Sequence, residues 1–353
     1  MKKRLLGVFF AALMVVCAAG CGSKEPQKQA ASTPAAEAAE ATEAAEDDKL
    51  TVGFSVANGE VLFCTDLNLG ALKACEELGV EAILLDANID VQKQLNGIDD
   101  LVDTKSVDVM ICEPADSTAI SAAVQACNNA GIPFMTADTP TTDPTGILCH
   151  VGSDNVDIGR AAGEYAVKLL TERNGSPSGD VLVIGYQVIE TLVLRTQGFM
   201  EVMEQYPDIN IVQKDVVQLN ISDAQNLMDD LLQAYPEGSL DLVYAPNATN
   251  CVGALAACEA ANRTDFDMVG VDDDPAQLEA LQKGGILKGT VVQFPTEIGY
   301  KAVKIAVDYL RGIEPESTNV KVDVETVTQE TINDFIDRYN ATQESLAKYK
   351  DML

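Results

Sequence analysis

The sequence contains a single histidine, His150, among 353 residues. We therefore expect neither a histidine-based metal cluster nor a Ser/His/Asp triad. The glycine-rich phosphate-binding patterns GxGxxG and GxxxxGK followed by Ser or Thr are also missing from the chain. These absences exclude the common nucleotide sites, and no cofactor is predicted.

One segment begins like a calcium loop. Asp86, Asn88 and Asp90 have the spacing of the first ligands of such a loop. The loop also needs Gly at the position of Val91 and a bidentate Glu at the position of Gly97. The segment is therefore expected to cap a helix, and no metal site is predicted.

Basic residues are scarce. The chain has 24 Lys and Arg against 55 Asp and Glu, which gives a net charge of -31 and a pI near 4.1. Nucleic acids and anionic membrane surfaces attract basic patches, so neither is expected as a partner.

Cysteine pairs with the CxxC spacing are also missing. Two of the nine cysteines, Cys17 and Cys21, belong to the N-terminal segment. The remaining seven are an odd number, and most lie in apolar runs; they are Cys64, Cys75, Cys112, Cys127, Cys149, Cys251 and Cys258. We expect buried cysteines that act as small hydrophobic residues, with one disulfide left open as an alternative.

The N-terminal segment has the parts of an export signal. Three basic residues at 2–4 precede an apolar run at 5–16, and small residues at 18–20 precede Cys21. This order resembles the bacterial lipobox and implies a lipoprotein signal peptide at 1–20. Cys21 would then carry two acyl chains through its sulfur, enough for a stable anchor on the extracytoplasmic face of the cell membrane. An ordinary secretory signal with a chance cysteine is the alternative.

Residues 21–48 are rich in Ala, Glu, Lys, Gln, Ser, Thr and Pro and have almost no branched apolar residues. Such a segment cannot bury enough surface to offset chain entropy. We predict a disordered acidic linker between the anchor and the folded part.

Short β-branched runs alternate with longer amphipathic stretches from Lys49 to about residue 327. The predicted strands are 50–56, 81–85, 107–112, 133–137, 148–152, 181–185, 209–217, 240–245, 268–271, 289–292 and 320–327. Helical patterns between them include 67–78, 91–102, 120–130, 158–170, 224–234, 251–261 and 298–310. This alternation predicts α/β architecture with parallel sheets covered by helices on both faces. Two sheets of five or six strands are easier to build than one of eleven.

Polar residues follow many of the predicted strands. They are Asp86, Glu113, Asp138, Asn247, Asp272 and Gln293. Because ligands of open α/β sheets bind outside the carboxyl ends of the strands, these side chains are expected to converge on a cleft. Asp and Asn at strand ends are also common caps and turn formers, and this structural role is favoured for Asp86 and Glu113. For the other four, ligand contact is predicted.

Several motifs resemble type I periplasmic sugar-binding proteins, the group of ribose- and galactose-type receptors. In the first half they are Asp-Ala-Asn-Ile-Asp-Val-Gln-Lys-Gln at 86–94, Glu-Pro-Ala-Asp-Ser at 113–117, Gly-Ile-Pro-Phe-Met-Thr-Ala-Asp at 131–138 and Gly-Ser-Asp-Asn at 152–155. In the second half they are Arg-Thr-Gln-Gly-Phe at 195–199, Ala-Pro-Asn-Ala-Thr-Asn at 245–250, Val-Gly-Val-Asp at 269–272 and Thr-Val-Val-Gln-Phe-Pro at 290–295. The resemblance spans residues 49 to about 327.

The resemblance implies two Rossmann-like lobes joined by a hinge with several crossovers, near Ser153, Gln293 and Asp323. It implies a first lobe at 49–152 plus 294–322 and a second lobe at 153–293 plus 323–329. A separate helix is expected at 330–353, where the sequence is charged and amphipathic.

Carried over by motif, the family's sugar contacts fall on Phe63, Asp138, Arg195, Asn247, Asp272 and Gln293. Phe63 would stack on the apolar face of the sugar. Four positions depart from the ribose receptors. Val61 and Cys64 replace an Asn and a second aromatic residue, Thr139 replaces an Arg, and Leu219 replaces an aromatic residue. A different pentose, hexose, cyclitol or sugar-like ligand is therefore open.

The resemblance implies a monomeric solute-binding protein that delivers a monosaccharide-like ligand to an ABC transporter permease. The only membrane contact expected is the lipid anchor. Two alternatives stay open. A receptor that reports its sugar to a chemoreceptor or sensor kinase would have the same sequence features. A glycosidase-like enzyme would need a carboxyl pair such as Asp138 and Asp272; both are expected to stay ionised beside Arg195, so no enzyme activity is predicted.

Overall fold

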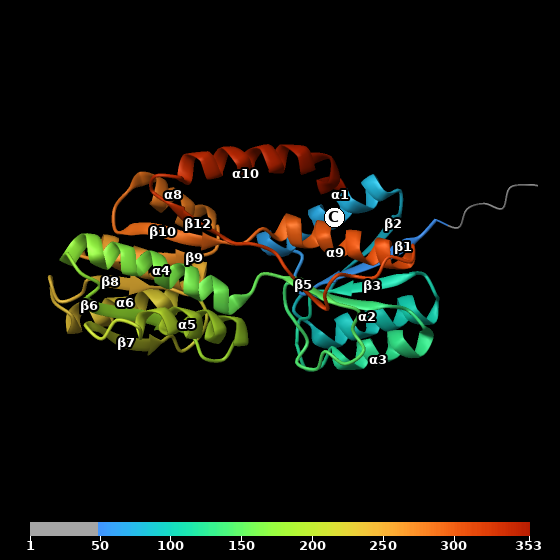
Figure 1. Ribbon diagram of the computed structural model, residues 1–353, viewed down its shortest axis with the longest axis horizontal. Helices are drawn as coiled ribbons and strands as arrows, with labels where there is room; N and C mark the ends of the chain where they lie inside the picture. The colour runs from blue at the N-terminus through green and yellow to red at the C-terminus, as the bar shows by residue number, and fades with distance from the viewer. Residues whose placement is uncertain (1–48) are drawn as a thin grey trace, which may run out of the picture. The chain divides into compact units, whose positions relative to one another are not determined.

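A computed structural model describes residues 49–353. The predicted signal peptide, the lipidation site at Cys21 and the acidic linker lie outside the described residues. The described part folds into two α/β lobes, each built on a six-stranded sheet (Figure 1). The expected fold class is confirmed.

The first sheet has the strand order β11-β5-β4-β3-β1-β2, and all its neighbouring strands are parallel. Its strands are β1 (Thr51–Val56), β2 (Glu81–Asp86), β3 (Val109–Cys112), β4 (Phe134–Ala137), β5 (His150–Gly152) and β11 (Asn319–Lys321). Helices α1 (Leu62–Leu78) and α9 (Pro295–Leu310) pack together on one face, and α2 (Val91–Asp103) and α3 (Ser121–Ala130) pack together on the other. We call this sheet and its helices the first lobe.

The second sheet has the order β12-β10-β9-β8-β6-β7, with only β12 antiparallel to its neighbour. Its strands are β6 (Gly179–Gly185), β7 (Ile209–Asp215), β8 (Leu242–Tyr244), β9 (Asp267–Val271), β10 (Leu287–Val292) and β12 (Glu325–Thr328). Helices α4 (Asn155–Asn174) and α5 (Glu190–Met203) cover one face. Helices α6 (Ile221–Ala234), α7 (Ala248–Ala260) and α8 (Pro275–Lys283) cover the other, and together they form the second lobe.

Both faces of the second sheet are buried, which explains its continuous apolar strands. Along β6, Val181 and Val183 pack under α4 and α5, whereas Leu182 and Ile184 pack under α6 and α7. The turns at the carboxyl ends of these strands are short and end in capping residues. Asn247 caps α7 and Asp274 caps α8, as Asp90 caps α2 in the first lobe. The turns therefore hold polar side chains rigidly at the sheet edge.

Three segments join the lobes: between β5 and α4, between β10 and α9, and between β11 and β12. The predicted strand at 320–327 is wrong in its extent, because it is two strands in different sheets. Val322 packs in the first lobe, where its N–H donates to the Gly152 carbonyl (3.0 Å), and Val324 packs against the second. The chain thus crosses between the lobes at a point where apolar and polar residues still alternate regularly. The sequence pattern therefore gives no sign that one strand ends and another begins there.

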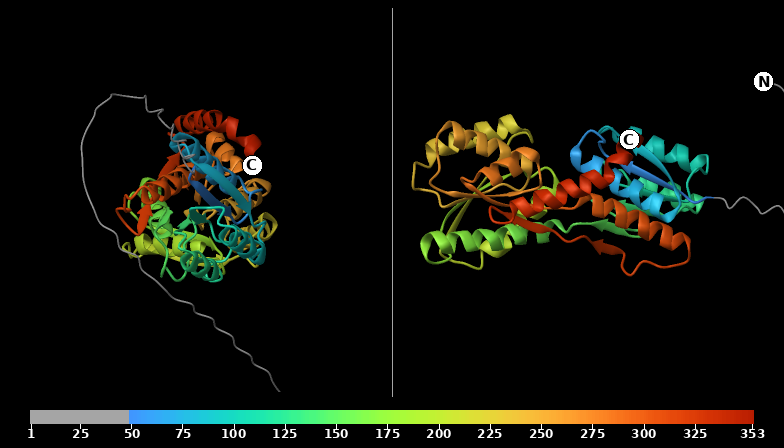
Figure 2. Two further views of the ribbon diagram at one scale, coloured as in Figure 1. Left: turned by 90° about the vertical axis from the view of Figure 1, so that its right-hand side faces the viewer. Right: turned by 90° about the horizontal axis from the view of Figure 1, so that it is seen from above.

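The chain ends in helix α10 (Ile332–Leu346) and the 3-10 helix η1 (Ala347–Met352). Helix α10 follows β12 of the second lobe and reaches the first lobe, as the red helix in Figures 1 and 2 shows. Within residues 49–353, every helix is too short or too polar to span a bilayer. All seven cysteines of these residues are buried and unpaired.

Candidate functional site

Arg195 is the centre of a polar group at the carboxyl ends of the second sheet. It lies in α5 and is only 7% exposed. Its Nη1 donates to Asp272 Oδ1 (3.2 Å) and to the Pro246 carbonyl (3.1 Å), and its Nε donates to Asn155 Oδ1 (2.9 Å). A guanidinium held through both Nε and Nη1 has a fixed direction. Asn155 was not among the predicted site residues.

Asp272 accepts three hydrogen bonds from three different elements. Besides Arg195, the Ala248 N–H donates to Oδ2 (3.1 Å) and Gln293 Nε2 donates to Oδ1 (3.3 Å). Gln293 is buried and stands where the chain crosses back to the first lobe. Asn247 precedes Ala248, and its Oδ1 caps α7 by accepting from the Asn250 N–H (3.2 Å). Hydrogen bonds thus join Arg195 and Gln293 to Asp272, and Asn247, whose side chain caps α7, stands next to Ala248; we call these four residues the second half-site.

The backbone of Asp272 has a φ of 79°, in the left-handed region. Gln277 holds this conformation: it is fully buried, and its Nε2 donates to the carbonyls of Val271 (3.1 Å) and Asp272 (2.9 Å) and to Thr290 Oγ1. Thr290 in turn donates to the Asp272 carbonyl (2.7 Å). Asp tolerates this conformation better than most residues. The clamp therefore aims the carboxylate at Arg195.

The first lobe contributes a second group of polar side chains. Asp138 follows β4 with a φ of 58°, and Thr139 Oγ1 donates to its Oδ2 (3.1 Å). Glu113 follows β3, is 7% exposed, and accepts from the Ala57 N–H (2.9 Å). The Cys64 thiol lies 3.6 Å from Glu113 Oε1. Phe63 precedes Cys64 in the first turn of α1 and is partly buried against the core of the first lobe. We call Phe63, Cys64, Glu113 and Asp138 the first half-site.

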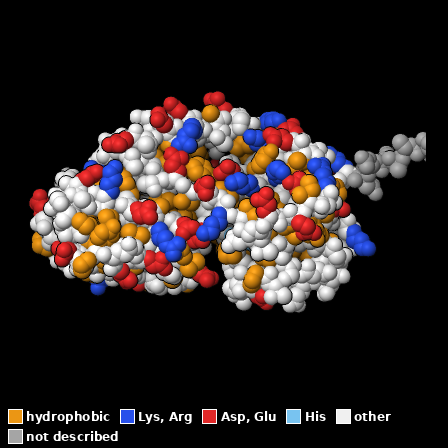
Figure 3. Space-filling view, in the orientation of Figure 1, with side chains coloured by type: hydrophobic (Ala, Val, Ile, Leu, Met, Phe, Trp, Pro, Cys, Tyr) orange, Lys and Arg blue, Asp and Glu red, His pale blue; other side chains and the backbone are white. Residues whose placement is uncertain are grey.

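The two half-sites affect each other's electrostatics. Burial raises the pKa of Asp138, Arg195 opposes that rise, and Asp272 adds to it. Since Arg195 and Asp272 belong to the second lobe, the acid of one lobe lies within the electric field of the other. Figure 3 shows a notch between the lobes on the face seen there. Asp138 therefore lies near enough to Arg195 and Asp272 for their charges to act on it, and its side chain accepts a hydrogen bond from Thr139 within its own lobe.

The carboxyl groups of the first lobe lie in different surroundings. Asp138 was expected to stay ionised beside Arg195; burial raises its pKa from the ordinary value, and the attraction of the guanidinium opposes that rise. Glu113 was expected to cap or turn the chain. Instead it is buried, and burial together with the charge of Asp138 raises its pKa to about 7. By contrast, Asp86 has the expected turn role, since its Oδ1 accepts from the Gly59 and Asn88 N–H groups (both 2.9 Å).

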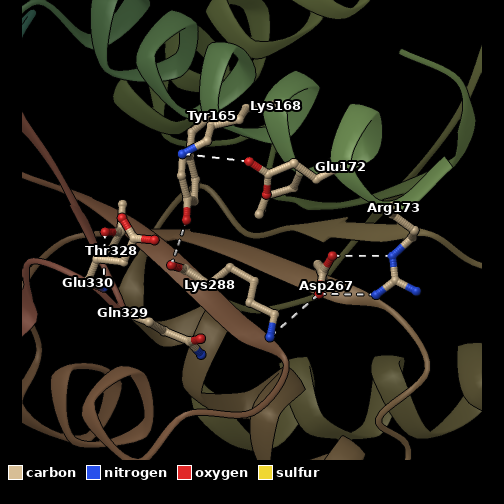
Figure 4. Close-up of a pocket in the computed structure, with 10 residues that line it drawn as sticks. Tyr165, Lys168, Glu172, Arg173, Asp267, Lys288, Thr328, Gln329 and Glu330 are labelled. Atoms are coloured by element: carbon tan, nitrogen blue, oxygen red, sulfur yellow. Dashed lines mark hydrogen bonds and ion pairs between the residues drawn. The ribbon is translucent and has the colours of Figure 1, made fainter. Parts of the chain in front are cut away.

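Another hollow, of about 390 Å³, lies on the second lobe (Figure 4). Its charges neutralise each other: Asp267 pairs with Arg173 (3.1 Å) and Lys288 (3.8 Å), and Lys168 pairs with Glu172 (3.8 Å). Asp267 is the first residue of β9, so the hollow lies at the amino ends of the strands. Ligands of open α/β sheets bind at the opposite edge. Within residues 49–353, no cluster of three or more His, Cys, Asp or Glu could hold a metal ion.

Comparisons with known proteins agree with this architecture. The family model of the periplasmic binding protein domain matches residues 31–314. The ribose import binding protein of Salmonella typhimurium is 29% identical over 282 residues, covering 80% of this chain and 92% of that protein. The D-apiose import binding protein of Actinobacillus succinogenes is 27% identical over 69% of this chain and 76% of its own length.

Solved structures give the same result. An ABC transporter solute-binding protein from Bacillus halodurans with bound myo-inositol is 27% identical, with a TM-score of 0.71 over 81% of this chain and 97% of its own. A solute-binding protein from Mycobacterium smegmatis with bound glycerol is 29% identical, with a TM-score of 0.69 over 81% and 96%. The chain thus belongs to the periplasmic binding protein family and, within it, to the type I sugar-binding group that includes the ribose import proteins.

Proposed function

We propose that this chain captures a monosaccharide-like, polyhydroxylated ligand between its lobes on the extracytoplasmic side of the membrane and delivers it to an ABC permease. The observation that carries this proposal is the hydrogen-bonded group of Arg195, Asp272 and Gln293 at the strand ends of the second lobe, whose charges act on Asp138 of the first lobe. The relatives named above, which import ribose and apiose or hold myo-inositol, support the ligand class.

The mixture of donors and acceptors suits hydroxyl groups. Arg195 donates, the side-chain oxygens of Asp272 accept, and the carboxamides of Asn247 and Gln293 can do both. Glu113, with a pKa of about 7, is partly protonated near neutral pH and can then donate as well. A sugar hydroxyl is both donor and acceptor, so a ring of hydroxyls satisfies such a set better than an apolar or multiply charged ligand does. Phe63 would cover an apolar face of the sugar.

The two half-sites belong to lobes joined by three crossings, so the complete set of contacts forms only when the lobes close. Ligand binding would shift the population towards the closed form. The permease would then receive the closed protein. A sensory role uses the same closed form, and uptake and signalling measured separately in a deletion strain would distinguish the two.

A thermal-shift panel tests the ligand class. The probes are D-ribose, D-allose, D-arabinose, myo-inositol and xylitol, with adenosine, whose ribose carries a purine base, as a nucleoside comparison. A ligand at about 100 times its Kd stabilises the native state by about 2.7 kcal/mol, so at least one of the five polyols is expected to raise the Tm by several degrees. A shift with adenosine alone, or with no polyol, would contradict the proposal.

A glycosidase-like activity is a second candidate, because a general acid needs a raised pKa and both Asp138 and Glu113 have one. Turnover of aryl glycosides by the purified protein would support it. Binding of a sugar from the panel without turnover would remove it.

The lipid anchor is part of the proposal, and its residue lies outside residues 49–353. Replacing Cys21 by Ser removes the sulfur that would carry the diacylglycerol. We expect the variant to move from the membrane fraction to the soluble extracytoplasmic fraction, because stable anchoring needs the acyl chains. Cys17→Ser, in the same segment, is the matched control and should stay with the membranes. Retention of Cys21→Ser in the membrane fraction would contradict the lipobox prediction.

A further inference from the structure

Helix α10 lies beyond the part of the chain that the family model matches. The match ends at residue 314, whereas α10 and η1 occupy residues 332–352. Figure 2 shows the helix running from the second lobe to the first, and Figure 1 shows the same path. The contacts at each of its ends and under its middle indicate what it does.

The first part of α10 is anchored in the second lobe. Ile332 and Phe335 are 1% and 3% exposed and belong to the core formed by α6, α7 and α8. The Arg338 guanidinium donates to both oxygens of Glu325 in β12 (2.6 and 2.8 Å). Two buried apolar side chains fix this end, and the ion pair, made through Nη2 of Arg338 alone, adds to them.

The end of α10 and the η1 turn that follows it are anchored in the first lobe. Leu346 and Tyr349 are 1% and 4% exposed and form a separate apolar cluster with Leu69 and Leu72 of α1. Around this cluster, Lys348 and Tyr349 both bond to the Glu76 carboxylate. This anchor therefore combines two buried apolar side chains with contacts to a carboxylate, as the anchor in the second lobe does.

A third contact lies close to the first half-site. Gln343 Nε2 donates to Asp66 Oδ1 (2.8 Å), and Asp66 is 2% exposed. Asp66 stands three residues after Phe63 in α1, about one helical turn away. The helix thus holds the same turn of α1 that carries Phe63.

Between the two anchors, α10 does not pack tightly on the hinge. A cavity of about 370 Å³ lies beneath it, bounded by Gln293 and Phe294 of the crossing segment and by Tyr339 and Thr342 of α10. A second hollow of about 460 Å³ reaches the other flank, next to Tyr300. The helix therefore touches both lobes firmly at its ends and leaves free space where the hinge turns.

We propose that α10 is a positioning element for ligand binding, which limits how far the two half-sites can move apart. An element anchored by buried side chains in both lobes cannot follow a large rotation without losing one anchor, and exposing either apolar cluster costs free energy. The free space over the hinge accommodates smaller rotations. The positioning residues are Leu346, Tyr349 and Gln343. What the half-sites bind rests on the proposed function, but the restriction of the lobes does not.

Distances between the lobes test the proposal without any ligand. Nitroxide labels are placed on Asp99→Cys in α2 and Gln233→Cys in α6, both exposed, and pulsed electron resonance gives the distance distribution. The seven native cysteines within residues 49–353 are buried, and the protein without the two added cysteines is the labelling control. Combining Leu346→Ala with Tyr349→Ala should widen the distribution by more than about 2 Å, the scale of a domain rearrangement.

Glu344→Ala is the matched control, because Glu344 is exposed on the same helix two residues before Leu346. It should leave the distribution unchanged. If the double variant does not fold, Gln343→Ala replaces it, with a wider distribution again expected. A distribution that superimposes on the parent in the folded anchor variant overturns the proposal. A failed sugar panel with a widened distribution would overturn only the ligand assignment.

Discussion

Replacing Asp272 by Asn is expected to weaken sugar binding by roughly 10- to 100-fold. The substitution removes the charge that pairs with Arg195 while keeping an oxygen for the Ala248 N–H. Hydrogen bonds to charged groups contribute about 1.5–3 kcal/mol, and each 1.4 kcal/mol is about tenfold in Kd. Isothermal titration with the panel sugar that gives the largest thermal shift measures the loss.

Asn is the better replacement at this position because of the backbone. With a φ of 79°, Asp272 occupies a region that Asn tolerates and Ala does not, so an Ala variant would mix strain with the lost contact. Arg195→Ala is the complementary change. It leaves the Asp272 carboxylate and the Pro246 carbonyl without their shared donor, and a loss of similar size is expected.

Asp86→Asn is the matched control for Asp272→Asn. Asp86 is also an acid at the carboxyl end of a strand, but it is exposed and accepts from the backbone N–H groups of Asn88 in its own turn and Gly59 in the loop after β1. Its replacement should leave the Kd unchanged. An unchanged Kd in Asp272→Asn would remove Asp272 from the ligand site, and an equal loss in both variants would show a general effect of charge.

The alternation of strands and helices follows from a pattern that a single sequence displays well. Runs such as 181–184 in β6 are apolar because both faces of the sheet are covered, and helices of regular period separate the strands. The split between β11 and β12 could not be predicted, since Val322 and Val324 continue one alternation although they pack in different lobes. Helix α1 also begins earlier than its periodic pattern, at Leu62 instead of residue 67, and so includes Phe63.

The site was predictable as far as it depends on strand ends. Asp138, Asn247, Asp272 and Gln293 all follow strands, and the parallel topology brings their edges together. Partners that lie in helices gave no such signal: Gln277 lies within α8 and Asn155 opens α4, and only the packing places them against Asp272 and Arg195. Glu113 did follow a strand, but its raised pKa depends on its burial and on the charge of Asp138, which is distant in the chain.

The buried carboxyl of Glu113 makes stability depend on pH. An unfolded Glu has a pKa of 4.5, whereas the folded value is about 7. Between these values the unfolded chain releases a proton that the folded chain keeps, so the free energy of unfolding falls as pH rises through this window and then levels off. The shift corresponds to a loss on the order of 3 kcal/mol. The raised pKa values of Asp138 and Asp273, the latter also about 7, act in the same direction.

Glu113→Gln should therefore stabilise the protein at pH 8 and have little effect at pH 4.5. Gln is uncharged at both values, and its Oε1 can still accept from the Ala57 N–H. Urea unfolding at the two pH values measures the difference, and part of the wild-type decline should remain because Asp138 and Asp273 still titrate. Glu259→Gln makes the same charge change at an exposed position of α7 and should stabilise at neither pH. If Glu113→Gln is no more stable than the wild type at pH 8, Glu113 is ionised at little cost, and its part in the first half-site must be that of a fixed acceptor for sugar hydroxyls.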